Sequence, residues 1–263
     1  MVRRLSFFLI AINFFGVLLG QEWTFILKQD VGQKITAVDI GTLGKYFVGT
    51  ERGNVYSFHQ DGSRDKHFSS AIFQPITDID ASNSLRIFVF YKSANQFEYL
   101  DRFTALPRTY QLEDFGLLRA DHAALDADGT IWFLSGSTLF HVIVFNYSIL
   151  SEQMLPNRLI DDVITDMAVD HHIILSNRQD GISTWDGSRL TAEVWSGAGV
   201  RAFHLSGDEL VALTTSEVLI RNLRTGGVGR FSPPRHDFTQ VLKAGNVFAF
   251  IRGSEIFWYR LNE

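Results

Sequence analysis

The sequence predicts an all-β protein built from a repeated four-stranded unit, and three observations lead to this prediction. A similar short segment opens each of six stretches of the chain, an apolar segment follows every opening, and Asp-Gly pairs fall between segments. No stretch has a convincing helical period of apolar residues. A repeat of this kind decides the architecture, because each unit needs its neighbours to bury its apolar faces.

The six openings are expected to be the first strands of the units. Their starts are 41, 46, 42, 36 and 38 residues apart, close to the roughly 40–45 residues of a four-stranded propeller blade. They read ITAVDI (35–40), ITDIDA (76–81), HAALDA (122–127), ITDMAV (164–169), VRAFHL (200–205) and FTQVLK (238–243). This spacing predicts a single β-propeller of six four-stranded blades.

The second segments are nearly continuous apolar runs, as expected for strands that are covered on both faces. The third segments alternate between apolar and polar residues more clearly, as in NVYSFH (54–59) and EIFWYR (255–260). Asp-Gly pairs tolerate the positive φ of tight hairpins, and they occur at 61–62, 128–129, 180–181 and 186–187. The second segments are KYFVGT (45–50), RIFVFY (86–91), TIWFLS (130–135), HIILSN (172–177), ELVALT (209–214) and NVFAFI (246–251).

The two ends of the chain suggest how the ring closes. Five repeats have a fourth strand, whereas the sixth reaches Glu263 after its third. The segment EWTFILKQ (22–29) precedes the first repeat and belongs to no unit. We expect it to supply the outer strand of the last blade, which would cover an otherwise exposed strand edge.

The first twenty residues resemble a secretory signal peptide. Arg3 and Arg4 precede the apolar run FFLIAINFFGVLLG (7–20), which is shorter than the roughly 20 residues that a membrane span needs. We expect a signal peptide at 1–20, cleaved after Gly20, and a propeller domain at 21–263 with no membrane span. An uncleaved N-terminal anchor is the alternative.

Charge and cysteine content narrow the compartment and the partners. Loss of two arginines and no acid with the leader changes the formal net charge from −5 to −7, which disfavours nucleic acid as a partner. The chain has no cysteine, which leans towards a bacterial envelope rather than a secreted animal protein. We expect a periplasmic protein, with an extracellular location as the alternative.

The segments GTERGNVYSFHQDGS (49–63) and RQDGISTWDGS (178–188) carry a family resemblance. They resemble exported bacterial propellers of the quinoprotein-like and sensor-propeller group. The resemblance covers the whole chain after residue 20, at the level of blade pattern. The Ala-x-Asp-x-x-Thr-Gly turn of the quinoproteins is absent, so no quinone cofactor is implied, and we expect no cofactor.

No pattern of residues points firmly to catalysis or to a metal. The eight histidines show no HxH or HExxH spacing. Asp126-x-Asp128-Gly129 resembles the start of a calcium loop but lacks its later ligands, and a hairpin turn explains it as well. The densest carboxylate cluster is Asp161, Asp162, Asp166 and Asp170, where a solvated loop before a strand is the simpler reading.

Surface loops offer candidate protein contacts. In a propeller, the loops between second and third strands lie on the same face as the loops that join one blade to the next. The first kind carries basic residues and the second kind carries apolar ones. The candidates are Arg52, Lys92, Arg178 and Arg252, with Phe73, Phe115, Leu117 and Leu159.

These observations favour a non-catalytic interaction module over an enzyme. We expect a monomer within a hetero-complex that docks on an envelope or outer-membrane protein of a secretion or assembly machinery and caps or plugs a channel. The alternative is a carbohydrate hydrolase or lyase, or a small-ligand sensor, that uses channel carboxylates such as Asp39, Asp80 or Asp166. Packing of the channel by Thr36, Thr77 and Thr165 would exclude that alternative.

Overall fold

The computed structural model describes residues 23–41, 43–83, 86–101, 107–156, 164–170, 172–177, 181–185, 190–196 and 199–262. The expected signal peptide and the candidate residues Arg178 and Leu159 lie outside them. The regular secondary structure of the described part consists of strands and two short 3-10 helices, η1 (Lys92–Ala94) and η2 (Leu112–Phe115). The predicted all-β fold is confirmed.

Five antiparallel sheets are each made of four consecutive strands, ordered from the centre of the molecule outward. The first two sheets contain β2 (Ile35–Ile40), β3 (Tyr46–Thr50), β4 (Asn54–Phe58) and β5 (Arg64–Ser69), then β6 (Asp78–Asp80), β7 (Arg86–Tyr91), β8 (Gln96–Asp101) and β9 (Arg108–Gln111). The next two contain β10 (His122–Leu125), β11 (Ile131–Ser135), β12 (Thr138–Ile143) and β13 (Ser148–Met154), then β14 (Ile164–Asp170), β15 (His172–Asn177), β16 (Gly181–Trp185) and β17 (Leu190–Ser196). The fifth contains β18 (Val200–Ser206), β19 (Glu209–Thr214), β20 (Val218–Asn222) and β21 (Val228–Phe231).

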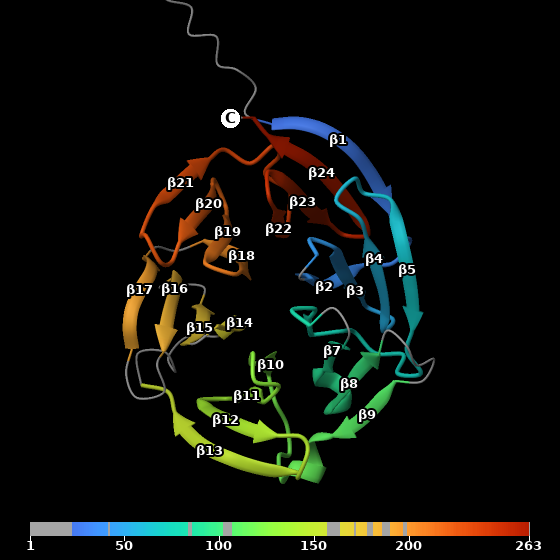
Figure 1. Ribbon diagram of the computed structural model, residues 1–263, viewed down its shortest axis with the longest axis vertical. Helices are drawn as coiled ribbons and strands as arrows, with labels where there is room; N and C mark the ends of the chain where they lie inside the picture. Colours follow the sequence, from blue (N-terminus) through green and yellow to red (C-terminus); the bar gives the residue numbers. More distant parts are fainter. Residues whose placement is uncertain are drawn as a thin grey trace, which may run out of the picture.

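A further four-stranded sheet combines the two ends of the described chain. Its strands are β22 (Gln240–Ala244), β23 (Val247–Arg252), β24 (Glu255–Leu261) and, on the outside, β1 (Trp23–Asp30). β1 pairs with β24 in antiparallel register from Trp23 opposite Leu261 to Asp30 opposite Glu255, with one irregularity between Phe25 and Leu27. Figure 1 shows β1 along the outside of this sheet.

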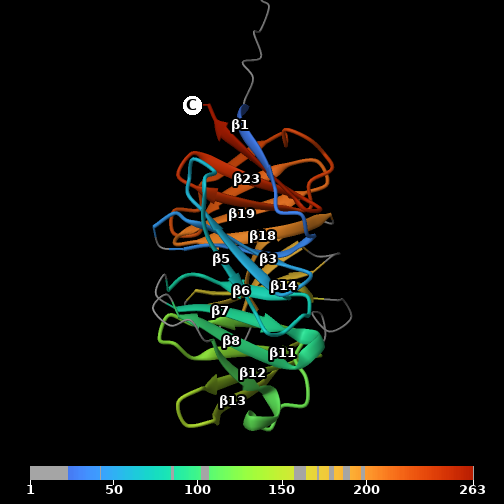
Figure 2. The same ribbon diagram turned by 90° about the vertical axis from the view of Figure 1, so that its right-hand side faces the viewer.

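The sheets stand radially around a common axis, so the predicted single β-propeller is confirmed (Figure 1). The innermost strands contact one another in the order β2, β6, β10, β14, β18 and β22, and β22 contacts β2 again. Seen from the side, the sheets lie one behind another and their connections gather at two opposite faces (Figure 2).

Apolar clusters fill the spaces between neighbouring sheets. Successive residues of one strand point to opposite faces of the sheet, so they belong to apolar clusters on its two sides. In β7, Phe88 and Phe90 pack against β11 and η2, whereas Ile87, Val89 and Tyr91 pack against β3 and β4. A strand covered on both faces therefore needs apolar residues at consecutive positions, which explains the runs seen in the sequence.

No helix in the part of the chain that the structure describes is long and apolar enough to cross a membrane.

Trp23 anchors β1 to the rest of its sheet. Its side chain is 5% exposed, its indole Nε1 donates a hydrogen bond of 2.7 Å to the Ser232 carbonyl, and its ring packs edge-on against Phe248 and Phe250 at centroid distances of 4.8 and 5.4 Å. Phe25, two residues later on the same strand, is 52% exposed. The two aromatic residues of β1 therefore form a matched pair, one buried and one exposed.

We expect Trp23→Ala to lower the free energy of unfolding by about 3–5 kcal/mol, because it leaves a cavity and an unpaired carbonyl. The same change at Phe25 should cost about 1 kcal/mol or less, as for an exposed residue. Urea denaturation followed by tryptophan fluorescence and circular dichroism measures both. Equal losses for the two variants would contradict the anchoring role of Trp23.

Candidate functional site

The six innermost strands enclose a cavity of about 850 Å³ along the axis of the propeller. Its wall is unusually rich in polar side chains for the inside of a β-protein, and the acidic ones come from three different sheets. The polar side chains on these strands that line it include Asp39 on β2, Asp78 and Asp80 on β6, Asp166 on β14, His204 on β18 and Gln240 on β22. We treat this constellation, the channel site, as the candidate functional site.

Some of these polar groups hold the neighbouring sheet. An innermost strand has one edge without a strand partner, so its backbone groups need other partners. Asp78 Oδ2 accepts a hydrogen bond of 2.9 Å from the backbone N–H of Ala123 in the next sheet. Asp39 Oδ2 accepts one of 2.5 Å from the N–H of Ala81, and Gln240 Nε2 donates one of 3.1 Å to the Thr36 carbonyl.

Asp80 and Asp166 accept local backbone hydrogen bonds instead. Asp80 Oδ1 accepts one of 2.9 Å from the N–H of Ser82, and Asp166 Oδ1 accepts one of 2.9 Å from the N–H of Met167. Each of the four channel carboxylates is therefore held by at least one backbone group.

The pair of His122 and Asp78 lies at one side of the channel, with His122 Nδ1 at 3.2 Å from Asp78 Oδ1. Burial alone would lower the pKa of His122, but the Asp78 carboxylate outweighs it and raises that pKa to about 9. The His122 ring is therefore protonated at neutral pH. Burial also raises the pKa of Asp166 to about 7, although the His122 charge opposes the rise.

Asp39 and Asp80 are crowded carboxylates. Burial, followed by repulsion from Asp80, raises the pKa of Asp39 well above its usual range. Burial also raises the pKa of Asp80. Perturbed carboxylates of this kind are common at functional sites, although structural networks produce them too.

His204 and Gln240 are the groups in this site whose hydrogen bonding is incomplete. The His204 side chain is 6% exposed and its Nδ1 lies 3.4 Å from Asp39 Oδ1. Both His204 Nε2 and Gln240 Oε1 are buried and have no hydrogen-bond partner within the part of the chain described. Burial lowers the pKa of His204 to about 4, so the ring is neutral at pH 7. The neutral Nε2 and the amide Oε1 can each accept a further hydrogen bond.

The carboxylates that the sequence suggested for a channel ligand or substrate line one cavity. The structure brings Asp39, Asp80 and Asp166 together around one cavity, and Thr36 and Thr165 line that cavity without filling it. Sequence reasoning missed Asp78, His122, His204 and Gln240 as members of the site. The signal was present, because each lies within one of the six openings of the repeat.

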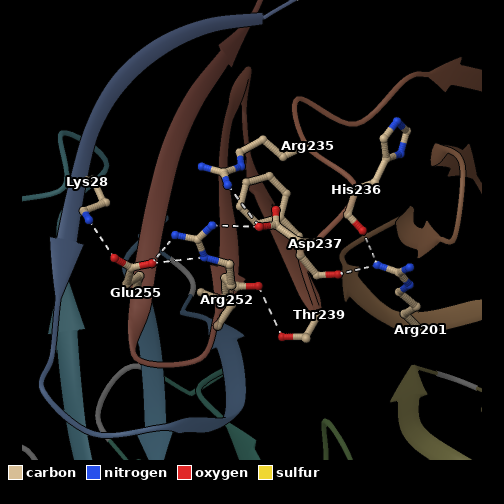
Figure 3. A network of polar contacts seen from close by, with 10 residues as sticks. Lys28, Arg201, Arg235, His236, Asp237, Thr239, Arg252 and Glu255 are labelled. Carbon is tan, nitrogen blue, oxygen red and sulfur yellow. Dashed lines mark hydrogen bonds and ion pairs between the residues drawn. The ribbon is translucent and has the colours of Figure 1, made fainter.

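The basic candidates have different surroundings. Arg52 is exposed, whereas Lys92 is paired with Asp121 at 2.9 Å. Arg252 lies in the network of Figure 3, where its guanidinium bonds to Asp237 at 2.7 Å and to Glu255. This pairing satisfies Arg252, so it is less available to a partner than the sequence suggested.

Two apolar candidates need correction. Phe115 and Leu117 are each 4% exposed and pack in the cluster between the second and third sheets. The turn of η2 folds them back over the sheet edges, so they cannot make direct contact with a partner. Phe73, in contrast, is 81% exposed, and so is Leu118 at 82%.

The Asp126-x-Asp128 segment is a hairpin turn with one additional neighbour. Asp126, Asp128 and His141 place their ligand atoms within 4.8 Å of one another. Turn hydrogen bonds already engage them, from Thr130 to Asp128 at 2.9 Å and from Trp132 to Asp126 at 3.2 Å. Of the other carboxylate cluster, Asp161 and Asp162 lie outside the described residues.

Comparisons with known proteins support the fold. No protein-family model and no curated protein sequence matches the chain. The WD40 domain of Neurospora crassa Pan2 matches with a TM-score of 0.64 at 9% identity, over 92% of this chain and 96% of that one. An inactive variant (H270A) of virginiamycin B lyase from Staphylococcus aureus, solved with quinupristin, matches with a TM-score of 0.64 at 11% identity, over 92% of this chain and 100% of that one. Identities this low establish a shared β-propeller fold and leave the activity open.

The charged pair in the channel predicts a pH dependence of stability. His122 has a folded pKa of about 9, above its unfolded value of about 6.5, so its contribution is complete below pH 6.5 and is lost as the pH rises to 9. Unfolding free energy should therefore fall over this range, by up to about 1.4 kcal/mol per pH unit. The raised pKa values of Asp39, Asp80 and Asp166 also make stability fall as the pH rises through them, whereas the lowered pKa of His204 makes stability rise between pH 4 and 6.5.

Urea unfolding at pH 6, 7, 8 and 9 measures this trend, and His122→Gln should flatten it while lowering stability at pH 6. His236→Gln is the control, because His236 is exposed. A slope that persists in the His122 variant would place its origin elsewhere.

Proposed function

We propose that the central channel binds a small polar molecule without chemical turnover. The observation that carries this proposal is the buried His204, which is one of the residues that line the cavity and whose Nε2 lacks a partner among the described residues. Buried polar atoms are normally satisfied, so an unsatisfied one inside a polar cavity suggests a ligand or an ordered solvent molecule.

The dimensions of the cavity agree with this proposal. Its volume of about 850 Å³ falls within the roughly 300–1,000 Å³ of small-molecule sites. The lyase of similar fold that was solved with quinupristin is consistent with a ligand site on such a fold. We favour binding over catalysis because the carboxylates accept backbone hydrogen bonds from the next sheet and so already serve the architecture.

A thermal-shift screen tests this proposal, with sugars, amino acids, amines and nucleosides as probes. Compounds that raise the Tm are then titrated by calorimetry into the protein, into His204→Phe and into the surface control His236→Phe. We expect His204→Phe to abolish binding by filling the site, and the control to leave it unchanged. Absence of any hit, or equal binding by both variants, would contradict a channel site.

Two exposed side chains favour a second candidate function, protein binding. Phe73 and Leu118 are 81% and 82% exposed and lie in the connections that lead from β5 to β6 and from η2 to β10. Such connections share one face of the propeller with Arg52. Aromatic side chains and arginines are enriched at the centres of protein interfaces.

We propose that this face docks on an envelope or outer-membrane protein in the bacterial periplasm, as one subunit of a hetero-complex. The compartment rests on the signal-like leader and the absence of cysteine in the sequence. The matched control lies on the opposite face. Phe145 is 94% exposed and lies in the connection between the third and fourth strands of its sheet.

Affinity purification in mild detergent after crosslinking tests the docking face. We expect Phe73→Ser combined with Leu118→Ser to lose a stoichiometric partner that Phe145→Ser retains. Recovery of the propeller alone, or loss of the partner only with Phe145→Ser, would count against this face.

We further propose that the six sheets are the blades of one ring and that the pairing of β1 with β24 closes it. The continuous circle of contacts among the innermost strands supports this arrangement. The comparison of Trp23 with Phe25 given above tests it.

A further inference from the structure

The charges and hydrogen-bonding capacity of the channel site narrow the class of its ligand. This step rests on the proposed channel site. We infer that the channel binds a primary organic amine, best a linear diamine, whose ammonium groups are held by Asp39, Asp80 and Asp166 with His204 Nε2 as an additional acceptor. Four features of the channel support this inference: its hydrogen-bond acceptors, its charged groups, the spacing of its carboxylates and the residues of its wall.

The channel site offers acceptors in excess of donors. Asp39 receives one backbone N–H at Oδ2 and faces His204 through Oδ1. Each carboxylate oxygen accepts two hydrogen bonds, so capacity is left on every aspartate. An ammonium group brings three donors and no acceptor, which matches this surplus better than a hydroxyl group does.

The carboxyl groups nearest the centre have no lysine or arginine as a direct partner among the described residues of the wall. Asp78 is paired with His122. Two cationic residues contribute to the wall, but Lys34 is exposed, and Arg201 donates to the carbonyls of His236 and Phe238 at 2.6 and 2.9 Å (Figure 3). Asp39 has the neutral ring of His204 beside it. Burial raises the pKa values of Asp39, Asp80 and Asp166, and a cation placed between these groups would favour their ionised forms.

The spacing of the carboxylates favours an organic cation over a metal ion. Among the described residues, three ligand atoms approach within 4.8 Å of one another at Asp126, Asp128 and His141, outside the channel. A bound Ca²⁺ needs oxygen ligands at about 2.3–2.6 Å. Asp39, Asp80 and Asp166 come from β2, β6 and β14, and a chain with an ammonium group at each end can reach separate carboxylates.

The wall also favours a primary amine over a quaternary ammonium ion. Sites for quaternary ammonium ions surround the cation with aromatic faces. Apart from the imidazole of His204, the described residues that line the cavity include one aromatic side chain, Phe203, which cannot surround a cation by itself. Recognition must therefore come from charge-assisted hydrogen bonds, which a quaternary ammonium ion cannot donate.

Isothermal titration calorimetry with three probes of similar size tests this inference at pH 7.5. The probes are 1,4-diaminobutane, the uncharged 1,4-butanediol and tetramethylammonium. We expect the diamine to bind about tenfold or more tightly than the other two, as charge-assisted hydrogen bonds imply. Asp39→Asn should weaken diamine binding by about tenfold or more, whereas the exposed control Asp208→Asn should leave it unchanged.

The outcomes separate this inference from the proposed function. Binding of the diol or of sugars at the His204-dependent site, with the diamine no tighter, would overturn the amine class and leave the channel site standing. No binding by any compound of the wider screen would overturn both. Should Asp39→Asn fail to fold by circular dichroism, Asp166→Asn takes its place, and unchanged diamine affinity in a folded variant of either residue would overturn the inference.

Discussion

The unpaired edge of the innermost strands is the constraint on which this structure depends. Each radial sheet has one unpaired strand edge next to the axis, and unpaired backbone groups at that edge are costly. The chain meets this need with side chains that reach across to the next sheet, as Asp78 does to Ala123 and Gln240 does to Thr36. The polar channel is therefore a consequence of closing a ring of sheets.

This constraint also explains why the channel is acidic. A backbone N–H needs an acceptor, and a short carboxylate reaches it from the neighbouring strand with little loss of side-chain entropy. Burial of these carboxyl groups, with repulsion between neighbouring carboxylates added to it, raises the pKa values of Asp39 and Asp166. A cation close to these carboxyl groups would stabilise their ionised forms, so the arrangement that holds the sheets together also favours a positively charged ligand.

The sequence predicted the repeat well because strand burial leaves a strong pattern. Consecutive apolar residues in β7 follow from coverage on both faces, and Asp-Gly pairs mark turns such as the one before Thr130. It predicted the site only in part. Asp39, Asp80 and Asp166 were named, but His122 and His204 looked like isolated histidines, because side chains that meet across the axis are about 40 residues apart or more in sequence. Phe115 and Leu117 were predicted to be exposed because the sequence shows only that they are apolar residues in a connection. The path of η2 shows that their side chains turn inward.

A structural role for the carboxylates strengthens the case for ligand binding instead of competing with it. Hydrogen bonds from fixed backbone groups hold Asp39 and Asp166 in place before any ligand arrives, so binding costs little side-chain entropy there. These backbone hydrogen bonds leave other lone pairs of the two carboxyl groups free to accept further hydrogen bonds. His204 differs, because no backbone group uses its Nε2. If this histidine served the architecture alone, an apolar residue of similar size would fill its place at a lower cost of burial. This is why we propose that its unsatisfied nitrogen marks a ligand site.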